Sequence, residues 1–92
     1  MNMQAQQSTV AIIGAGSIGT GWAVVFGDAG HKVRLFDAVP ARLQAARGEI
    51  AARLADLQEF DILNDTPDDV LDRISFCTDM AEAVAGAIHV QE

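Results

Sequence analysis

The sequence is poor in the residues that define several common protein classes. It contains a single cysteine, Cys77, so no disulfide can form within the chain and no cysteine spacing points to a zinc site. Positive charge is scarce as well, with six Lys and Arg residues against thirteen Asp and Glu and a formal net charge of -7. A chain of this charge repels nucleic acid and anionic lipid, so we expect neither as a partner.

Long hydrophobic runs and a basic N-terminal region are also absent from the sequence. No apolar run approaches the ~18 residues of a membrane span, and the polar start of the chain does not resemble a signal peptide. Half of the residues are nevertheless apolar and the mean hydropathy is +0.19, which excludes a disordered chain. The 92 residues suffice for one small domain, so a two-domain enzyme would be incomplete here. We expect a cytoplasmic protein without a membrane partner.

Short apolar runs recur along the chain and predict four strands. Residues 1–7 are polar and are expected to form a flexible leader. The run at 9–13 shows no strict alternation, which is typical of a strand covered on both faces of a parallel sheet. Similar runs at 33–36, 74–77 and 87–90 predict three further strands.

Helical periodicity fills the segments between these runs. In the first segment the apolar positions follow helical spacing, and Gly30 supplies the C-cap. Pro40 opens a longer amphipathic helix whose apolar positions continue to Leu57. Capping signals predict two shorter helices, one starting at Thr66-Pro67 and one after Asp79. The apolar positions of the first helix are Ile18, Trp22, Val25, Phe26 and Ala29.

Strands separated by helices indicate a parallel sheet with right-handed crossovers and helices on its faces. The fold class is therefore α/β, and the chain should supply the first four strands of a doubly wound sheet. Because such sheets place their strands in the order 3-2-1-4, the fourth strand should lie beside the first.

The loop after the first strand is glycine-rich. Its glycines have the spacing G-x-G-x-x-G and stand between a predicted strand and a predicted helix, which is the setting of a Rossmann dinucleotide site. In such a loop the first glycine makes the turn, the second admits the diphosphate and the third allows close packing of the helix. The helix amides then bind phosphate without a lysine. The loop reads Gly14-Ala15-Gly16-Ser17-Ile18-Gly19.

An acid at the end of the second strand indicates which dinucleotide binds. Asp37 stands 18 residues beyond Gly19, where the adenosine ribose should lie. Its carboxylate can accept hydrogen bonds from a 2'-hydroxyl and repels the 2'-phosphate of NADP, so the predicted cofactor is NAD. Arg42, the nearby cation, is interpreted as a solvated helix charge. FAD stays open as an alternative, because flavoproteins use the same glycines.

The predicted cofactor-binding residues are Gly14, Gly16, Ser17, Ile18, Gly19 and Asp37.

The remaining polar candidates favour structural roles. His31 follows a helix cap and is expected to face solvent, and His89 lies in a strand without a Ser, Cys or carboxylate constellation nearby. Cys77 is most simply a small buried apolar residue, and Trp22 is interpreted as a packing residue. The sequence predicts neither a catalytic residue nor a metal ligand.

Three segments together resemble the 3-hydroxyacyl-CoA dehydrogenase family. They are VAIIGAGSIG at 10–19, VRLFD at 33–37 and AVAGAIHVQE at 83–92, with a long helical excursion after Asp37. Trp22 and the ending are most similar to the branch containing lambda-crystallin, an L-gulonate dehydrogenase. The resemblance extends over nearly the whole chain.

The resemblance implies a two-domain enzyme that oxidises a 3-hydroxyl group to a ketone with NAD, in fatty acid metabolism. Residues 8–92 would form part of its NAD-binding Rossmann domain, and a C-terminal helical domain, absent from this chain, would complete the substrate site and form a homodimer. The family's catalytic histidine, glutamate, asparagine and serine follow the fourth strand. They would lie beyond Glu92, so this chain alone is expected to be inactive.

Two alternatives stay open at the level of function. Family members often bind coenzyme A through the excursion after Asp37, yet residues 54–72 hold seven acids and no Lys or Arg. This charge favours a small hydroxy acid over a 3-hydroxyacyl-CoA as the substrate. A non-catalytic, NAD-sensing Rossmann module explains the missing catalytic groups equally well.

Overall fold

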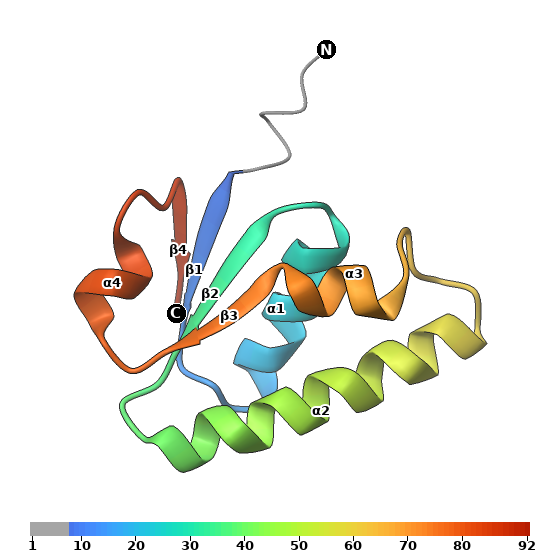
Figure 1. Ribbon diagram of the computed structural model, residues 1–92, viewed down its shortest axis with the longest axis horizontal. Helices are drawn as coiled ribbons and strands as arrows, with labels where there is room; N and C mark the ends of the chain where they lie inside the picture. The colour runs from blue at the N-terminus through green and yellow to red at the C-terminus, as the bar shows by residue number, and fades with distance from the viewer. Residues whose placement is uncertain (1–7) are drawn as a thin grey trace.

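The computed structural model describes residues 8–92, so the leader expected at 1–7 lies outside the described residues. Four strands form one parallel sheet in the order β3-β2-β1-β4 (Figure 1). This order confirms the α/β, doubly wound arrangement predicted from the alternation of strands and helices. The strands are β1 (Thr9–Ile13), β2 (Lys32–Phe36), β3 (Ile74–Cys77) and β4 (His89–Gln91).

The last strand begins later than the sequence predicts. Apolar residues indicated a strand at 87–90, whereas β4 starts at His89. Ala87 still belongs to the preceding turn, since its amide donates to the carbonyl of Val84 at 3.0 Å. Gly86 makes that turn with a φ of +71°, a backbone angle that glycine adopts without strain.

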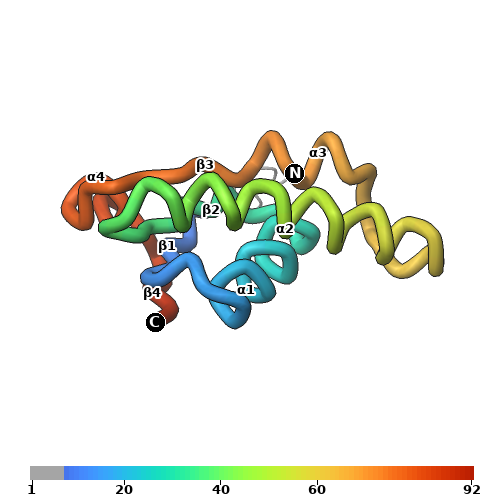
Figure 2. Tube along the Cα trace, turned by 90° about the horizontal axis from the view of Figure 1, so that it is seen from below, coloured from blue at the N-terminus to red at the C-terminus, as the bar shows by residue number. Residues whose placement is uncertain are grey.

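The helices lie on both faces of the sheet. The chain steps from β1 to β2 to β3 in one direction and returns for β4, so right-handed crossovers place three helices on one face and one on the other (Figure 1). α1 and α2 pack side by side on the shared face (Figure 2). The helices are α1 (Ser17–Asp28), α2 (Pro40–Glu59), α3 (Pro67–Asp72) and α4 (Met80–Val84).

The buried face of α1 differs from its most apolar positions. Helical spacing located the helix, yet Ile18 is 76% exposed and Val25 is 57% exposed. The face against the sheet is made of small residues instead, because α1 packs close to its neighbours: a Cβ at Gly27 would lie 3.1 Å from Val70. The buried residues of α1 are Thr20, Ala23, Val24 and Gly27.

The end of α1 corrects two predictions. Ala29 is the C-cap, and Gly30 is the following residue, with a φ of +101°. The amides of Gly30 and His31 donate to the carbonyls of Gly27 and Phe26, which is the Schellman pattern. His31 was expected to face solvent, but it is half-buried, with its Nδ1 atom buried and its ring against Phe26. The turn folds it inward, because the Schellman bonds bring residue 31 back over α1.

One hydrophobic core lies between the sheet and the helices α1 and α2. β1 and β2 contribute residues that point at α1 and α2, and the long helix α2 buries one residue on each successive turn. Within residues 8–92 no helix is both long and apolar enough to cross a membrane. The fully buried large side chains include Val10, Ile12, Val33, Leu35, Ile50 and Leu54.

Candidate cofactor-binding site

The glycine loop lies at the carboxyl end of the central strand, where β1 passes into α1. Gly14 has a φ of +106°, and its amide donates to the carbonyl of Phe36 at 2.8 Å, which ties the loop to the end of β2. A cleft of about 420 Å³ opens beside the loop. It lies where doubly wound sheets bind their ligands, outside the carboxyl ends of the strands. The cleft is lined by Ile12, Ile13, Gly14, Gly16, Ser17, Ile18, Gly19, Trp22 and Glu92.

The second and third glycines of the loop differ in the space around them. A Cβ at Gly19 would stand 1.9 Å from the carbonyl oxygen of Gly14, so the helix approaches the loop too closely for any side chain. A Cβ at Gly16 would meet no described heavy atom within 4 Å. Protein packing therefore requires glycine at 19, whereas the space at 16 is free for a ligand that lies against the backbone.

The first turn of α1 is open to an anion. Its N-cap is Gly16, which has no side chain to cap the helix, and no described side chain bonds to the first amides. The amides of Ser17 and Ile18 start the helix, where the helix dipole is positive. Ile18 and Trp22 line the same cleft. The sequence treated Trp22 as packing only; its ring stacks on Phe26 at 5.7 Å and is also 37% exposed in the cleft wall.

Asp37 follows β2 and lies beside the glycine loop. One carboxylate oxygen accepts the amide of Ala15 at 3.1 Å, and the other accepts the amide of Val39 at 2.9 Å. These two bonds lower the pKa of the Asp37 carboxyl group, with a smaller contribution from Arg42, against the opposing effect of burial. The residue is 7% exposed. Asp37 is thus an anion that faces the loop and also fixes it.

Arg42 is solvated, as the sequence suggested, and it also lies near Asp37. Its Nη1 atom lies 3.9 Å from an Asp37 carboxylate oxygen, although its side chain is 68% exposed. Pro40 starts α2 directly after β2, and the first turn of that helix brings residue 42 back over the strand end. The cation therefore borders the predicted ribose position.

Two charged residues of α2 contact Ser17 at the edge of the site, and the sequence did not predict either of them. Arg53 donates to the carbonyl oxygen of Ser17 at 3.2 Å and to its hydroxyl at 3.3 Å, and it pairs with Glu49 at 2.5 Å. The contacts span more than thirty residues of sequence, so spacing could not reveal them. A signal was present in Gly21, a glycine within α1 that the dinucleotide motif does not explain.

The two histidines lie at the other end of the sheet. His31 precedes β2, and His89 pairs with Val10 near the start of β1, so neither reaches the carboxyl ends of the strands. His89 contacts the Phe26 ring at 5.7 Å and the Gln91 side chain at 3.1 Å. Cys77 is buried, as predicted, and burial raises the pKa of its thiol. Within residues 8–92 no three potential metal ligands cluster together.

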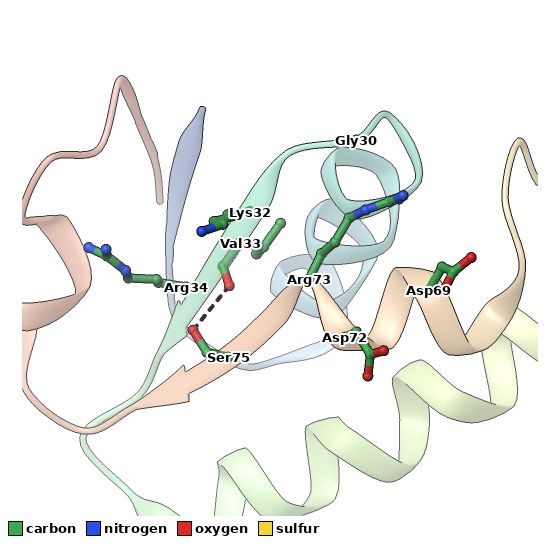
Figure 3. Close-up of a pocket in the computed structure, with 8 residues that line it drawn as sticks. All are labelled: Gly30, Lys32, Val33, Arg34, Asp69, Asp72, Arg73 and Ser75. Atoms are coloured by element: carbon green, nitrogen blue, oxygen red, sulfur yellow. Dashed lines mark hydrogen bonds between the residues drawn. The ribbon is translucent and has the colours of Figure 1, made fainter. Parts of the chain in front are cut away.

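A slightly larger cleft, of about 460 Å³, opens at the amino ends of β2 and β3 (Figure 3). Its arginines are already bonded to the protein. Arg34 donates to the carbonyls of Glu82 and Ala85 at the end of α4, and Arg73 donates to Gly27 and pairs with Asp65. This cleft is held by structural contacts, and it lies away from the glycine loop.

Known proteins are similar to this chain in sequence and in fold. A family profile described as "3-hydroxyacyl-CoA dehydrogenase, NAD binding domain" matches residues 9–92. Lambda-crystallin of Oryctolagus cuniculus is 36% identical over 85 residues, which cover 90% of this chain and 27% of that protein. L-carnitine dehydrogenase/betainyl-CoA thioesterase of Ruegeria pomeroyi is 40% identical over 85 residues, covering 92% of this chain and 17% of that protein.

Solved structures agree with these relatives. The crystal structure of 3-hydroxybutyryl-CoA dehydrogenase from Escherichia coli K12 superposes with a TM-score of 0.78 at 32% identity, over 94% of this chain and 19% of that one. That of (S)-3-hydroxybutyryl-CoA dehydrogenase from Ralstonia eutropha gives 0.81 at 28% identity, over 94% and 31%. This chain therefore spans about a quarter of the length of lambda-crystallin. It belongs to the 3-hydroxyacyl-CoA dehydrogenase family, matching that family's NAD-binding domain.

Proposed function

We propose that the chain binds NAD in the cleft beside Gly14–Gly19 and supplies the cofactor half of a dehydrogenase acting on a 3-hydroxyl group. The observation that carries the proposal is the open space at Gly16, where a Cβ would meet no described atom within 4 Å. Packing gives no reason for glycine there. A diphosphate lying against the backbone does, beside a helix start without a side-chain cap.

Each residue of the site has a defined task in this proposal. The amides of Ser17 and Ile18 donate to the diphosphate at the positive end of α1. Asp37 accepts hydrogen bonds from the ribose hydroxyls with the lone pairs left free by Ala15 and Val39. Bound NAD supplies the hydride acceptor for oxidation of an alcohol to a ketone. The Asp37 carboxylate favours NAD over NADP, and the positive charge of Arg42 makes this preference smaller.

The substrate of the proposed dehydrogenase is a small 3-hydroxy acid, with a 3-hydroxyacyl-CoA as the alternative. Residues 54–72 hold seven acids and no Lys or Arg, so they offer nothing to the phosphates of coenzyme A. The proposal also includes a cytoplasmic location, a homodimer formed with a helical domain, and no nucleic-acid or membrane partner. Calorimetric titration with coenzyme A tests the substrate class, and saturable binding to this chain would favour the acyl-CoA.

Binding of NADH to the chain tests the cofactor site directly. Trp22 is the only tryptophan and lines the cleft, so energy transfer from its indole to the reduced nicotinamide reports binding. We expect saturable transfer in the parent chain. Gly16→Ala should weaken NADH binding at least tenfold because the methyl group takes the space of the diphosphate, while thermal unfolding stays unchanged. Gly48→Ala, at an open position of α2, is the matched control. Unaltered NADH binding by Gly16→Ala would contradict the site.

A non-catalytic NAD-sensing module is the second candidate function. It explains the positions of His31 and His89, away from the carboxyl ends of the strands where neither can serve as a base beside bound cofactor, as well as the enzyme proposal does. For the same reason we expect the chain alone to bind NAD without oxidising L-gulonate or 3-hydroxybutyryl-CoA. Turnover of a 3-hydroxy acid by a longer protein containing this chain would support the enzyme over the module.

A further inference from the structure

Arg53 lies over the first turn of α1, although it belongs to α2. Its Nη2 atom is 3.2 Å from the carbonyl oxygen of Ser17, 3.3 Å from the Ser17 hydroxyl and 2.5 Å from a Glu49 carboxylate oxygen. The same Glu49 oxygen lies 3.4 Å from the hydroxyl of Thr20. One ion pair of α2 therefore contacts the turn whose amides face the cleft.

Gly21 provides the space in which Arg53 lies. A Cβ at this position would stand 3.0 Å from the Nη1 atom of Arg53, closer than side chains normally approach. Glycine within a helix is less favourable than alanine, so a packing reason is expected for it. Gly48 on α2 meets no described atom within 4 Å and offers no comparable reason.

The charges at this turn would otherwise oppose an anionic ligand. Glu49 places a carboxylate beside Ser17 and Thr20, at the helix end where the diphosphate is proposed to bind. Arg53 neutralises that carboxylate and adds donors on the outer side of the turn. Both side chains are partly exposed, with 35% for Arg53 and 40% for Glu49, so they lie within reach of solvent ions.

We propose that Arg53 is a positioning residue of the cofactor site. Its guanidinium packs against Gly21, donates to Ser17 and neutralises the charge of Glu49, so that the first turn of α1 accepts the diphosphate of the dinucleotide. The inference rests on the proposed NAD site and adds a contribution from α2. Arg53 acts through Ser17, and the cofactor reaches the cleft side of the same turn.

Binding of ADP-ribose and adenosine by the full chain separates this role from a general effect on folding. We expect Arg53→Ala to weaken ADP-ribose and NAD binding about tenfold, the scale of one lost charge-assisted interaction. Adenosine, which lacks the diphosphate, should bind both proteins equally. Arg53→Lys should recover part of the loss, and the difference should shrink at high salt because the pair is solvent-accessible.

Four further variants complete the test, and two of them, Gly48→Ala and Arg47→Ala, are controls. Gly21→Ala should weaken ADP-ribose binding by less than Arg53→Ala does, since its methyl group requires only a small shift of the guanidinium, whereas Gly48→Ala should leave binding unchanged. Glu49→Gln should bind ADP-ribose at least as tightly as the parent and should restore part of the affinity lost in Arg53→Ala. Arg47→Ala removes an equal charge from α2 at a residue that stacks on Phe76, and it should have no effect.

Three results would overturn the proposal for Arg53. They are parent-like ADP-ribose binding by Arg53→Ala, an equal loss of adenosine binding, and a loss in Glu49→Gln as large as that in Arg53→Ala. If the parent chain binds neither NAD nor ADP-ribose, the proposed cofactor site is itself wrong, and the inference about Arg53 fails with it. Failure of the two proposals is therefore distinguishable.

Discussion

The two ends of the parallel sheet differ in how their polar groups are bonded. At the amino end, Arg34 is bonded to the carbonyls that end α4, and Arg73 is bonded to Gly27 and Asp65. At the carboxyl end, no described side chain accepts a hydrogen bond from the first amides of α1, and Gly16 faces open space. A cleft is present at both ends, and their volumes, about 460 and 420 Å³, are similar.

The difference shows that bonding, more than size, distinguishes a ligand site from a structural cleft. Charged groups that already satisfy one another hold the fold together and have little left to offer a ligand. The amides at the exposed start of α1 can be bonded by water in the free chain, and they stay available to a ligand beside Gly16, where no packing contact requires glycine. The comparison can be tested at both ends of the sheet.

The largest effect is expected where the carboxyl end packs most tightly. Gly19→Ala would place a methyl group 1.9 Å from the carbonyl oxygen of Gly14, so either the loop or α1 must move. We expect a loss of about 3 kcal/mol in the free energy of unfolding, the upper range for overpacking. Urea unfolding followed by circular dichroism measures it. A loss of less than about 0.5 kcal/mol, the size of a typical surface substitution, would mean that a small shift of the loop or of α1 relieves the close approach.

Asp37 should distinguish the cofactors at the same end. Asp37→Ala is expected to weaken NAD binding by roughly 1–3 kcal/mol more than NADP binding, because the ribose hydroxyls lose their acceptor while the repulsion of the 2'-phosphate disappears. Both cofactors should lose some affinity, since Ala15 loses its partner in the loop. Calorimetry with each cofactor measures the difference. Equal losses would show that Asp37 only fixes the loop.

The acid sensitivity of the fold should depend on the same carboxylate. The pKa of Asp37 is lowered from its ordinary value of 3.8 in the folded state, so the unfolded chain binds its proton first as the pH falls. The resulting stabilisation is fully present above that value and is lost as the pH falls through the lower, folded pKa. Asp37→Asn should therefore show a flatter decline of stability below pH ~4. A decline as steep as that of the parent would assign acid unfolding to other groups.

The smallest effect is expected at the amino end. Arg34→Ala removes two bonds to the carbonyls of Glu82 and Ala85, and should cost about 1 kcal/mol of stability without changing NAD affinity. Lys32, an exposed residue on the same strand, provides the control, and Lys32→Ala should change neither quantity. Thermal unfolding and NADH titration check both. A several-fold change in NAD affinity for Arg34→Ala would couple the two ends of the sheet.

Much of the fold was predictable because local signals agreed with one another. The capping residues Thr66 and Asp79 located α3 and α4, and both accept the amide bonds that their positions indicate. The run at Thr9–Ile13 and the glycines after it located the central strand and the loop. These signals depend on residues within one turn or one strand, so the sequence displays them directly.

The remainder depends on contacts between distant segments. The buried face of α1 could not be read from its apolar residues, since close packing against Val70 selects Gly27 and leaves Ile18 outside. The contact of Arg53 with Ser17 depends on how α2 lies against α1, which no local spacing determines. The predicted cofactor residues are brought together at one cleft apart from Asp37, which borders the loop; their binding role stays a prediction.

The position of β1 has a consequence for how the chain folds during synthesis. β1 pairs with β2 on one side and with β4 on the other, so its two neighbours come from an early and a late part of the sequence. On the ribosome, β1 and β2 can pair while α2 is still being made, but the other edge of β1 stays open until β4 emerges. Val10 and Ile12 lie on this strand, so the nascent chain carries a strand with an apolar face and one unpaired edge from the synthesis of β2 until β4 emerges. The interval before β4 emerges is therefore the one in which β1 is most open to pairing with another chain.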